Sequence, residues 1–130
     1  MQGLDHYRSV GAYGAAAAAD RKELILRMLE GAQDRIASAR GHMQRAETAD
    51  KGEAIGKAIG IIDGLRASLD AEKGGEIAAN LDALYDYMNR RLVEANAADR
   101  VELLDEVSNL LGEIRSAWQS AMTSPEAAPA

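Results

Sequence analysis

The sequence predicts an all-α protein, an antiparallel up-down four-helix bundle with a flexible N-terminal arm and a disordered C-terminal tail. Four segments repeat apolar residues at spacings of three and four, which is the period of an amphipathic helix. No segment shows the strict alternation of a half-buried strand. The connections are short, and short loops make sequence neighbours antiparallel neighbours in space. We expect an arm over residues 1–19, one bundle domain over 20–122 and a tail over 123–130.

Three acidic pairs, spaced like capping boxes, predict where helices begin. In each, an aspartate can accept bonds from the first free N–H groups, and a glutamate three positions later meets the positive end of the helix dipole. The pairs are Asp20 with Glu23, Asp50 with Glu53, and Asp99 with Glu102.

The first two helices are predicted over residues 20–46 and 51–72, each with one buried stripe. The first stripe comprises Leu24, Ile25, Met28, Leu29, Ala32, Ile36, Ala39 and Met43. The second comprises Ile55, Ala58, Ile59, Ile62, Leu65 and Leu69. Gly74 and Gly75 then provide a left-handed stop.

The third helix is expected after the glycine pair, and a short joint over residues 96–98 separates it from the fourth. The third stripe comprises Ile77, Leu81, Leu84, Tyr85, Met88, Leu92 and Ala95, and the fourth comprises Val101, Leu104, Val107, Leu111, Ile114 and Trp118. The tail contains two prolines among alanines and lacks bulky residues that would offset the entropy of ordering. In the arm, glycines interrupt an apolar face that includes Tyr7.

Composition excludes several classes of function. The 130 residues contain no cysteine, which removes disulfides, thiolate metal sites and cysteine nucleophiles. The net charge of −6 opposes binding to a phosphate backbone, so no nucleic-acid partner is expected. No signal core or membrane span is recognisable, and we expect a cytoplasmic protein without membrane insertion.

No residue pattern predicts catalysis, a cofactor or a metal site, so an enzyme is not expected. The histidines His6 and His42 lack the Glu-x-x-His pattern of di-iron bundles and are interpreted as solvated side chains. One alternative is a histidine phosphotransfer module that uses His42. Such domains usually place a lysine and then a glycine shortly after the histidine, whereas His42 is followed by Met43-Gln44-Arg45-Ala46. A general helix-binding adaptor is a second alternative.

Glycines recur every four residues along the second predicted helix, at Gly52, Gly56, Gly60 and Gly64. Each costs about 1 kcal/mol relative to alanine, so this ridge weakens the isolated helix. Either another helix packs closely against the ridge, or tertiary packing tolerates an exposed flexible face. The sequence leaves both interpretations open.

The segments EKGGEIAANL, LYDYMNRRL and VEAN, with DEVSNLLGEIRSAW further on, resemble the family of flagellar export chaperones called FliS. The resemblance runs from Tyr7 to Trp118. Two departures occur at its start: Ala19-Asp20 replaces the Ser-Pro that often opens the family's first helix, and an alanine run blurs the alignment of the arm.

The resemblance implies an ATP-independent chaperone that binds the C-terminal segment of flagellin, prevents its premature polymerisation and delivers it to the flagellar type III export gate. Further implied partners are a component of that gate and an anti-sigma factor or co-chaperone. The arm tyrosine, Tyr7, matches a family residue whose segment can cover the guest site. The other expected guest contacts are Ile55, Ile59, Ile62, Leu65, Leu69, Leu84, Tyr87 and Leu92, several of which must also build the core.

Overall fold

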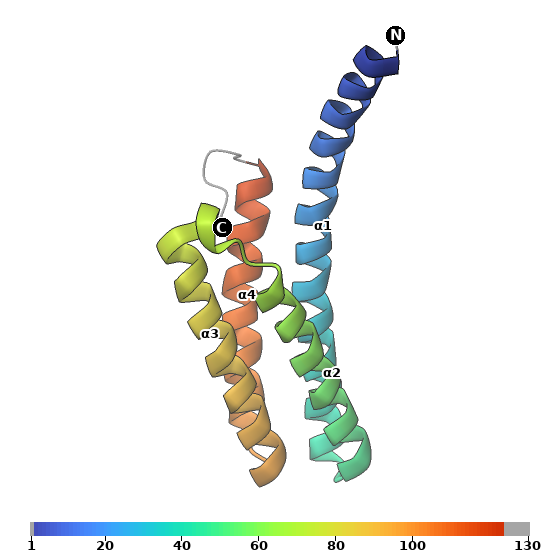
Figure 1. Ribbon diagram of the computed structural model, residues 1–130. Coiled ribbons are helices and arrows are strands. Elements are labelled where there is room, and N and C mark those ends of the chain that lie inside the picture. Colours follow the sequence, from blue (N-terminus) through green and yellow to red (C-terminus); the bar gives the residue numbers. More distant parts are fainter. Residues whose placement is uncertain (1, 124–130) are drawn as a thin grey trace.

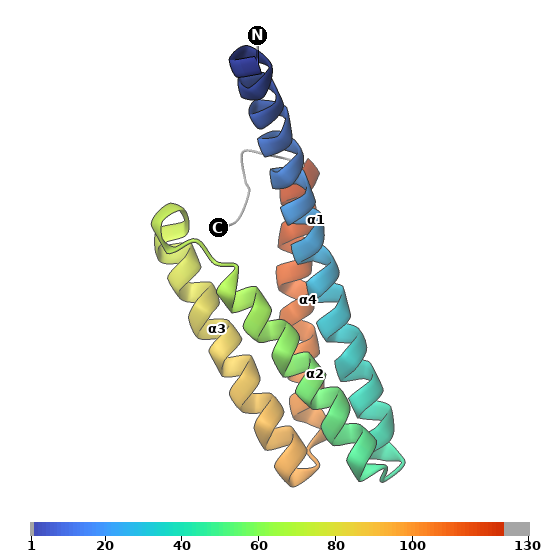
Figure 2. The ribbon, with the colours of Figure 1, turned by 45° about the vertical axis from the view of Figure 1, so that its right-hand side comes forward.

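The computed structural model describes the backbone of residues 2–123 and the side chains of residues 20–121. The described chain consists of four helices: α1 (Gln2–Gln44), α2 (Thr48–Ala67), α3 (Ala71–Ala98) and α4 (Val101–Thr123). Each helix packs against its two neighbours in the order α1, α2, α3, α4 and back to α1, and among the described residues the Cα atoms of the diagonal pairs do not come within 8 Å of each other. Figures 1 and 2 show this antiparallel arrangement. The predicted up-down bundle is confirmed.

The helix start predicted at Asp20 is wrong, because α1 begins at Gln2 and passes through Asp20 without a break. The run from Ala15 to Ala19 lies directly before it, and alanine has the highest helix propensity of all residues. The part of α1 that was predicted as an arm projects beyond the other helices (Figure 1). The side chains of this part, including Tyr7, and the tail over residues 124–130 lie outside the described residues.

The two other predicted caps are also displaced. The second helix starts at Thr48, so Asp50 lies in its first turn, and its N-cap Glu47 makes no capping side-chain bond. The fourth helix starts at Val101, two residues after Asp99. Asp99 instead ends α3 in the left-handed conformation, with φ of 50°, and its carboxylate binds Lys51.

The turn between α2 and α3 comes earlier than the glycine pair predicted. The second helix ends at Ala67, and Asp70 caps α3 by accepting bonds from the backbone N–H groups of Glu72 and Lys73. Gly75 forms a kink inside α3, with φ of 52° and ψ of −122°. A positive φ with this ψ is accessible to glycine at little cost, so the predicted break exists but does not separate the helices.

The core runs through the bundle and draws on all four helices. Its largest fully buried side chains are Leu29, Ile36, Ile55, Ile62, Leu65, Tyr85, Met88, Leu92, Leu104, Val107 and Leu111. These residues belong to the predicted stripes, and Trp118 is buried as expected. Two stripe residues are exceptions, because Leu24 and Ile77 are exposed to 56% and 53%.

Candidate functional site

The residues predicted to contact a guest fall into two groups in the structure. Four are fully buried in the core and offer no surface in this conformation: Ile55, Ile62, Leu65 and Leu92. Four others are partly buried: Ile59, Leu69, Leu84 and Tyr87. The first three of these pack against the core. Their role in binding stays a prediction, and a guest could reach only the second group without opening the bundle.

In the half of the bundle that carries the α2–α3 turn, several apolar side chains are exposed or only partly buried. We call this the apolar end and define it by Leu24, Leu69, Ile77, Leu81 and Leu84. Leu24 and Ile77 are more than half exposed, while the other three are partly buried. On α3, Ile77, Leu81 and Leu84 follow each other at spacings of four and three, so they form one stripe along the helix. This end therefore presents apolar surface that the chain's described residues do not cover.

Burial of the apolar end is incomplete for a geometric reason. Ile77 lies in the first two turns of α3, two residues after the Gly75 kink. Leu24 lies near the level at which α2 ends, since Arg21 of α1 donates a hydrogen bond of 2.6 Å to the carbonyl of Ser68. Above this level α1 has no α2 residue beside it (Figure 2).

The four glycines of α2 do not act alike. A Cβ atom at Gly64 would come within 2.8 Å of Met28 Cε on α1, so this glycine permits close packing. A Cβ atom at Gly52 would make an ordinary contact with Asn96, 3.9 Å away. At Gly56 and Gly60 it would meet open space among the described side chains. The ridge is thus partly packed and partly exposed.

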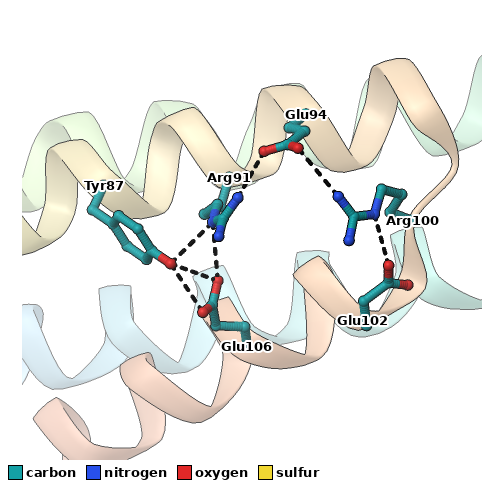
Figure 3. Close-up of polar contacts among 6 residues, drawn as sticks. All are labelled: Tyr87, Arg91, Glu94, Arg100, Glu102 and Glu106. Carbon is teal, nitrogen blue, oxygen red and sulfur yellow. Dashed lines mark hydrogen bonds and ion pairs between the residues drawn. The ribbon is translucent and has the colours of Figure 1, made fainter.

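Tyr87 is engaged within the chain, on the seam between α3 and α4 (Figure 3). Its hydroxyl donates to the carboxylate of Glu106, at 2.9 and 3.0 Å from the two oxygens. Arg91 Nε donates to the same hydroxyl at 2.9 Å, and the guanidinium groups of Arg90 and Arg91 lie 5.9 and 5.3 Å from the centre of the ring. The polar tip of Tyr87 is satisfied, so a guest would contact mainly its ring.

The network continues from Arg91 towards the α3–α4 connection (Figure 3). Glu94 accepts bonds from Arg91 at 2.8 Å and from Arg100 at 3.2 Å, and Arg100 also binds Glu102 at 2.7 Å. The hydrogen bond to Tyr87, followed by that to Glu94, raises the pKa of Arg91 above its ordinary value. Arg91 is thus held in intramolecular bonds.

The opposite end of the bundle, which carries the α1–α2 and α3–α4 connections, is held together by charged groups. We call it the polar end and define it by Arg40, Glu47, Lys51, Asp99 and Arg100. The side chain of Lys51 is only 4% exposed, and its ammonium donates to Asp99 at 2.5 Å and to the carbonyl of Asn96 at 2.9 Å. Arg40 binds Asp105 through two bonds, of 2.8 and 3.3 Å. These contacts tie each helix at this end to another.

His42 also lies at the polar end, and it is not the freely solvated side chain that the sequence predicted. Its Nδ1 atom is 3.1 Å from Glu47 Oε1, and Arg45 Nη2 lies 3.3 Å from the same nitrogen. With Asp50, His42 and Glu47 place one potential ligand atom each within 4.8 Å of one another. Their sequence spacing matches no familiar metal motif; the turn between α1 and α2 brings them together. This engagement of the ring gives phosphotransfer no support.

Sequence reasoning missed the exposure of Leu24 and Ile77 and did not consider Val93, which is 58% exposed. Val93 could have been found, because it is an apolar residue outside the α3 stripe. Leu24 and Ile77 could not, since their spacing matches the core pattern. No helix within the described part of the chain combines the length and the apolar content needed to cross a bilayer.

Comparisons with known proteins agree with the resemblance of the sequence. The profile of the family described as flagellar protein FliS matches residues 3–125. The flagellar secretion chaperone FliSB of Pseudomonas aeruginosa is 49% identical over 118 residues, which cover 91% of this chain and 94% of that protein. The flagellar secretion chaperones FliS of Salmonella typhimurium and Vibrio cholerae are 44% and 37% identical. Their alignments cover 90% and 88% of this chain, and 87% and 85% of the respective relatives.

Proposed function

The chain belongs to the FliS family of flagellar proteins, and we propose that it is a cytoplasmic export chaperone for flagellin. In this role it binds the C-terminal segment of flagellin, prevents premature polymerisation and delivers the bound protein to the flagellar type III export gate. The observation that carries the proposal is the similarity to flagellar secretion chaperones over about nine tenths of the chain. A gate component is the implied second partner. An anti-sigma factor or a co-chaperone is a further one.

The apolar end is the surface that we assign to the guest. A disordered segment that folds on binding needs apolar area to offset the entropy of ordering, and amphipathic helices bind by laying their apolar face in such places. Ile77, Leu81 and Leu84 offer a stripe along α3, while Leu24 on α1 and Leu69 in the α2–α3 turn are further incompletely buried apolar side chains. Of the residues predicted from sequence, this assignment retains Leu69 and Leu84 as contacts at this end.

The remaining predicted contacts take different places in the proposal. Ile59 and the ring of Tyr87 are partly exposed along the bundle, and a guest that wraps around it could reach them. The four buried residues support the surface from below rather than touching the guest. Tyr7 belongs to the part of α1 that projects past the apolar end, where its segment could compete with the guest for the same surface.

Calorimetry with a peptide that spans the C-terminal segment of the cognate flagellin tests the proposal. We expect one peptide to bind per chain with a large negative change in heat capacity, since apolar area is buried as the peptide folds. Ile77→Asp should weaken binding about 10-fold, equivalent to about 1.4 kcal/mol. Val93→Asp is the matched control, because Val93 is equally exposed but lies outside the apolar end.

The outcomes separate the function from its location. Absence of binding by the wild-type chain would contradict the chaperone role for that flagellin. Binding that Ile77→Asp and Val93→Asp weaken equally, or that neither weakens, would leave the chaperone role standing and would show that the apolar end is not the guest surface. Tighter binding by Tyr7→Ala would support competition by the N-terminal part of α1.

A further inference from the structure

We propose that the corner between α1 and α2 is a binding site for one divalent transition-metal ion, with His42, Glu47 and Asp50 as its ligands. The three residues come from the last turn of α1, the connection and the first turn of α2. One ligand atom from each lies within 4.8 Å of the others. The site would join two helices at the polar end, far from the surface assigned to the guest, and does not depend on that assignment.

The spacing of the donor atoms suits a small ion. Zinc binds nitrogen and oxygen at about 2.0–2.2 Å, so two ligands of a tetrahedral site lie about 3.4 Å apart. His42 Nδ1 and Glu47 Oε1 are already 3.1 Å apart. Asp50 must come nearer by a change of rotamer, which is possible because its side chain is exposed and makes no hydrogen bond or ion pair among the described residues. The fourth position remains for water.

The backbone holds the donors in this arrangement without help from a metal. Glu47 N donates to the carbonyl of His42 at 2.9 Å, so the two ligand-bearing residues are joined through their main chains. Ala46 adopts the left-handed conformation, with φ of 57°, and thereby turns the chain back on itself. Lys51 N donates to the carbonyl of Glu47 at 2.9 Å, so Glu47 is also bonded through its main chain to the first turn of α2. A metal would therefore bind a corner that is already formed.

The donor set favours borderline transition metals over magnesium or calcium. One imidazole with carboxylate oxygens is a combination found around zinc, whereas magnesium and calcium take oxygen ligands. The site contains no thiolate because the chain has no cysteine. Metal binding through Nδ1 of His42 requires the ring tautomer that carries its proton on Nε2.

Arg45 shows that cations are attracted to this position. Its Nε atom donates to Glu47 Oε1 at 2.6 Å, and its Nη2 atom lies 3.3 Å from His42 Nδ1. The guanidinium thus contacts two of the three donor atoms that a metal would use. Because the Arg45 side chain is 59% exposed, it can move into solvent when the ion enters. It competes with the metal, and its removal should strengthen metal binding.

The surroundings leave room and little uncompensated positive charge. His42 borders two hollows of about 190 and 200 Å³, one lined also by Glu47 and the other by Asp50. Of the nearby lysines, Lys51 is paired with Asp99, and Lys57 is paired with Glu53 at 3.0 Å. Arg35 lines the second hollow together with Asp50, and Arg45 is paired with Glu47.

Titration of the full chain with Zn²⁺, followed by calorimetry, tests the site, and Co²⁺ absorption reports the coordination geometry. We expect one ion per chain and a higher thermal unfolding midpoint in its presence, because the ion binds only the folded corner. His42→Gln should lower the affinity by at least about 10-fold. His6→Gln, which replaces the other histidine of the chain, is the matched control and should leave the affinity unchanged.

Two further variants keep the test decisive. Asp50→Asn changes an exposed side chain that has no hydrogen-bond or ion-pair partner among the described residues, and it should weaken zinc binding while the chain stays folded. Arg45→Gln should bind zinc several-fold more tightly than the wild type. Absence of binding by both the wild type and Arg45→Gln would overturn the proposal, as would binding that His6→Gln weakens but His42→Gln and Asp50→Asn do not.

Discussion

At the polar end, charged side chains join the helices, whereas at the apolar end leucine and isoleucine side chains remain partly uncovered. The buried Lys51 and the Arg40–Asp105 pair hold the polar end closed. At the other end, Leu24 and Ile77 are more than half exposed. Burial of apolar area is the main stabilising term in folding, so uncovered apolar side chains contribute little to stability. The two ends therefore differ in what covers them: charged pairs join the helices at the polar end, whereas some of the apolar side chains at the other end are not covered by described residues.

Matched leucine truncations should reveal this difference most strongly. Leu104 is fully buried near the start of α4, and Leu104→Ala should lower the free energy of unfolding by about 3 kcal/mol through lost burial and the resulting cavity. Leu81→Ala, at the partly exposed apolar end, should lower it by only about 1 kcal/mol. Urea unfolding followed by circular dichroism measures both. Equal losses would contradict the division between the two ends.

The burial of Tyr85, next to the partly buried Leu84, can be tested by measuring the unfolding free energy at alkaline pH. Leu84 is partly buried, but the next residue, Tyr85, is almost fully buried, and burial raises the pKa of Tyr85 to about 12. Since the unfolded chain releases this proton near pH 10, the stabilisation is complete below pH 10 and is lost as the pH rises towards 12. The loss should amount to roughly 2 kcal/mol.

The control for this measurement is Tyr85→Phe, which cannot ionise. Lysines also titrate in this range, so the informative quantity is the difference between the two pH profiles of unfolding free energy. If both proteins lost stability equally between pH 10 and 12, Tyr85 would be accessible to solvent and the core would not be sealed beside the apolar end.

The helices could be predicted from sequence because each stripe repeats over several turns. Leu29, Met88 and Leu104 belong to stripes whose period is decided locally, and all three are buried as expected. The connections were harder, since their residues have tertiary partners. Asp99 was expected to cap α4, but it binds Lys51, 48 positions earlier in the chain. The alanines before Asp20 likewise carry the helix past a cap signal.

The candidate surfaces were less predictable than the fold. Exposure of Leu24 and Ile77 depends on where the neighbouring helices end, which periodicity does not report. The ligand atoms of His42, Glu47 and Asp50 come together because Ala46, in the left-handed conformation, turns the chain. The spacing of residues along a helix does not predict such a turn. Conversely, the network of Tyr87 with Glu106 joins residues 19 positions apart on different helices.

A smaller loss of stability is expected when the ion pair between Lys51 and Asp99 at the polar end, called the clasp below, is broken. Asp99→Asn keeps a residue that tolerates the left-handed conformation but removes the charge that faces Lys51. Because the Asp99 side chain is 68% exposed, solvent weakens the pair, and we expect a loss of about 1.5 kcal/mol. Glu113→Gln, at an exposed position outside the clasp, is the control for charge removal and should have almost no effect. A loss no larger than that of the control would show that the clasp does not stabilise this end.

The smallest effect should appear at acid pH, and it should map to the polar end. The pKa of Glu47 is lowered mainly by a hydrogen bond with His42 and next by one from Arg45. The pKa of Glu102 is lowered mainly by a hydrogen bond from the backbone N–H of Glu102 itself and next by one from Arg100. The unfolded glutamates take up protons near pH 4.5, so both groups stabilise the fold above that pH and lose this contribution as the pH falls through the lower folded values. The unfolding free energy of the double variant Glu47→Gln with Glu102→Gln should therefore decline less steeply between pH 5 and 3 than that of the wild type. The difference between the two declines should be small, because exposed ion pairs contribute little to stability. Glu113→Gln should retain the wild-type slope, and an identical slope in the double variant would mean that these carboxylates do not stabilise the polar end.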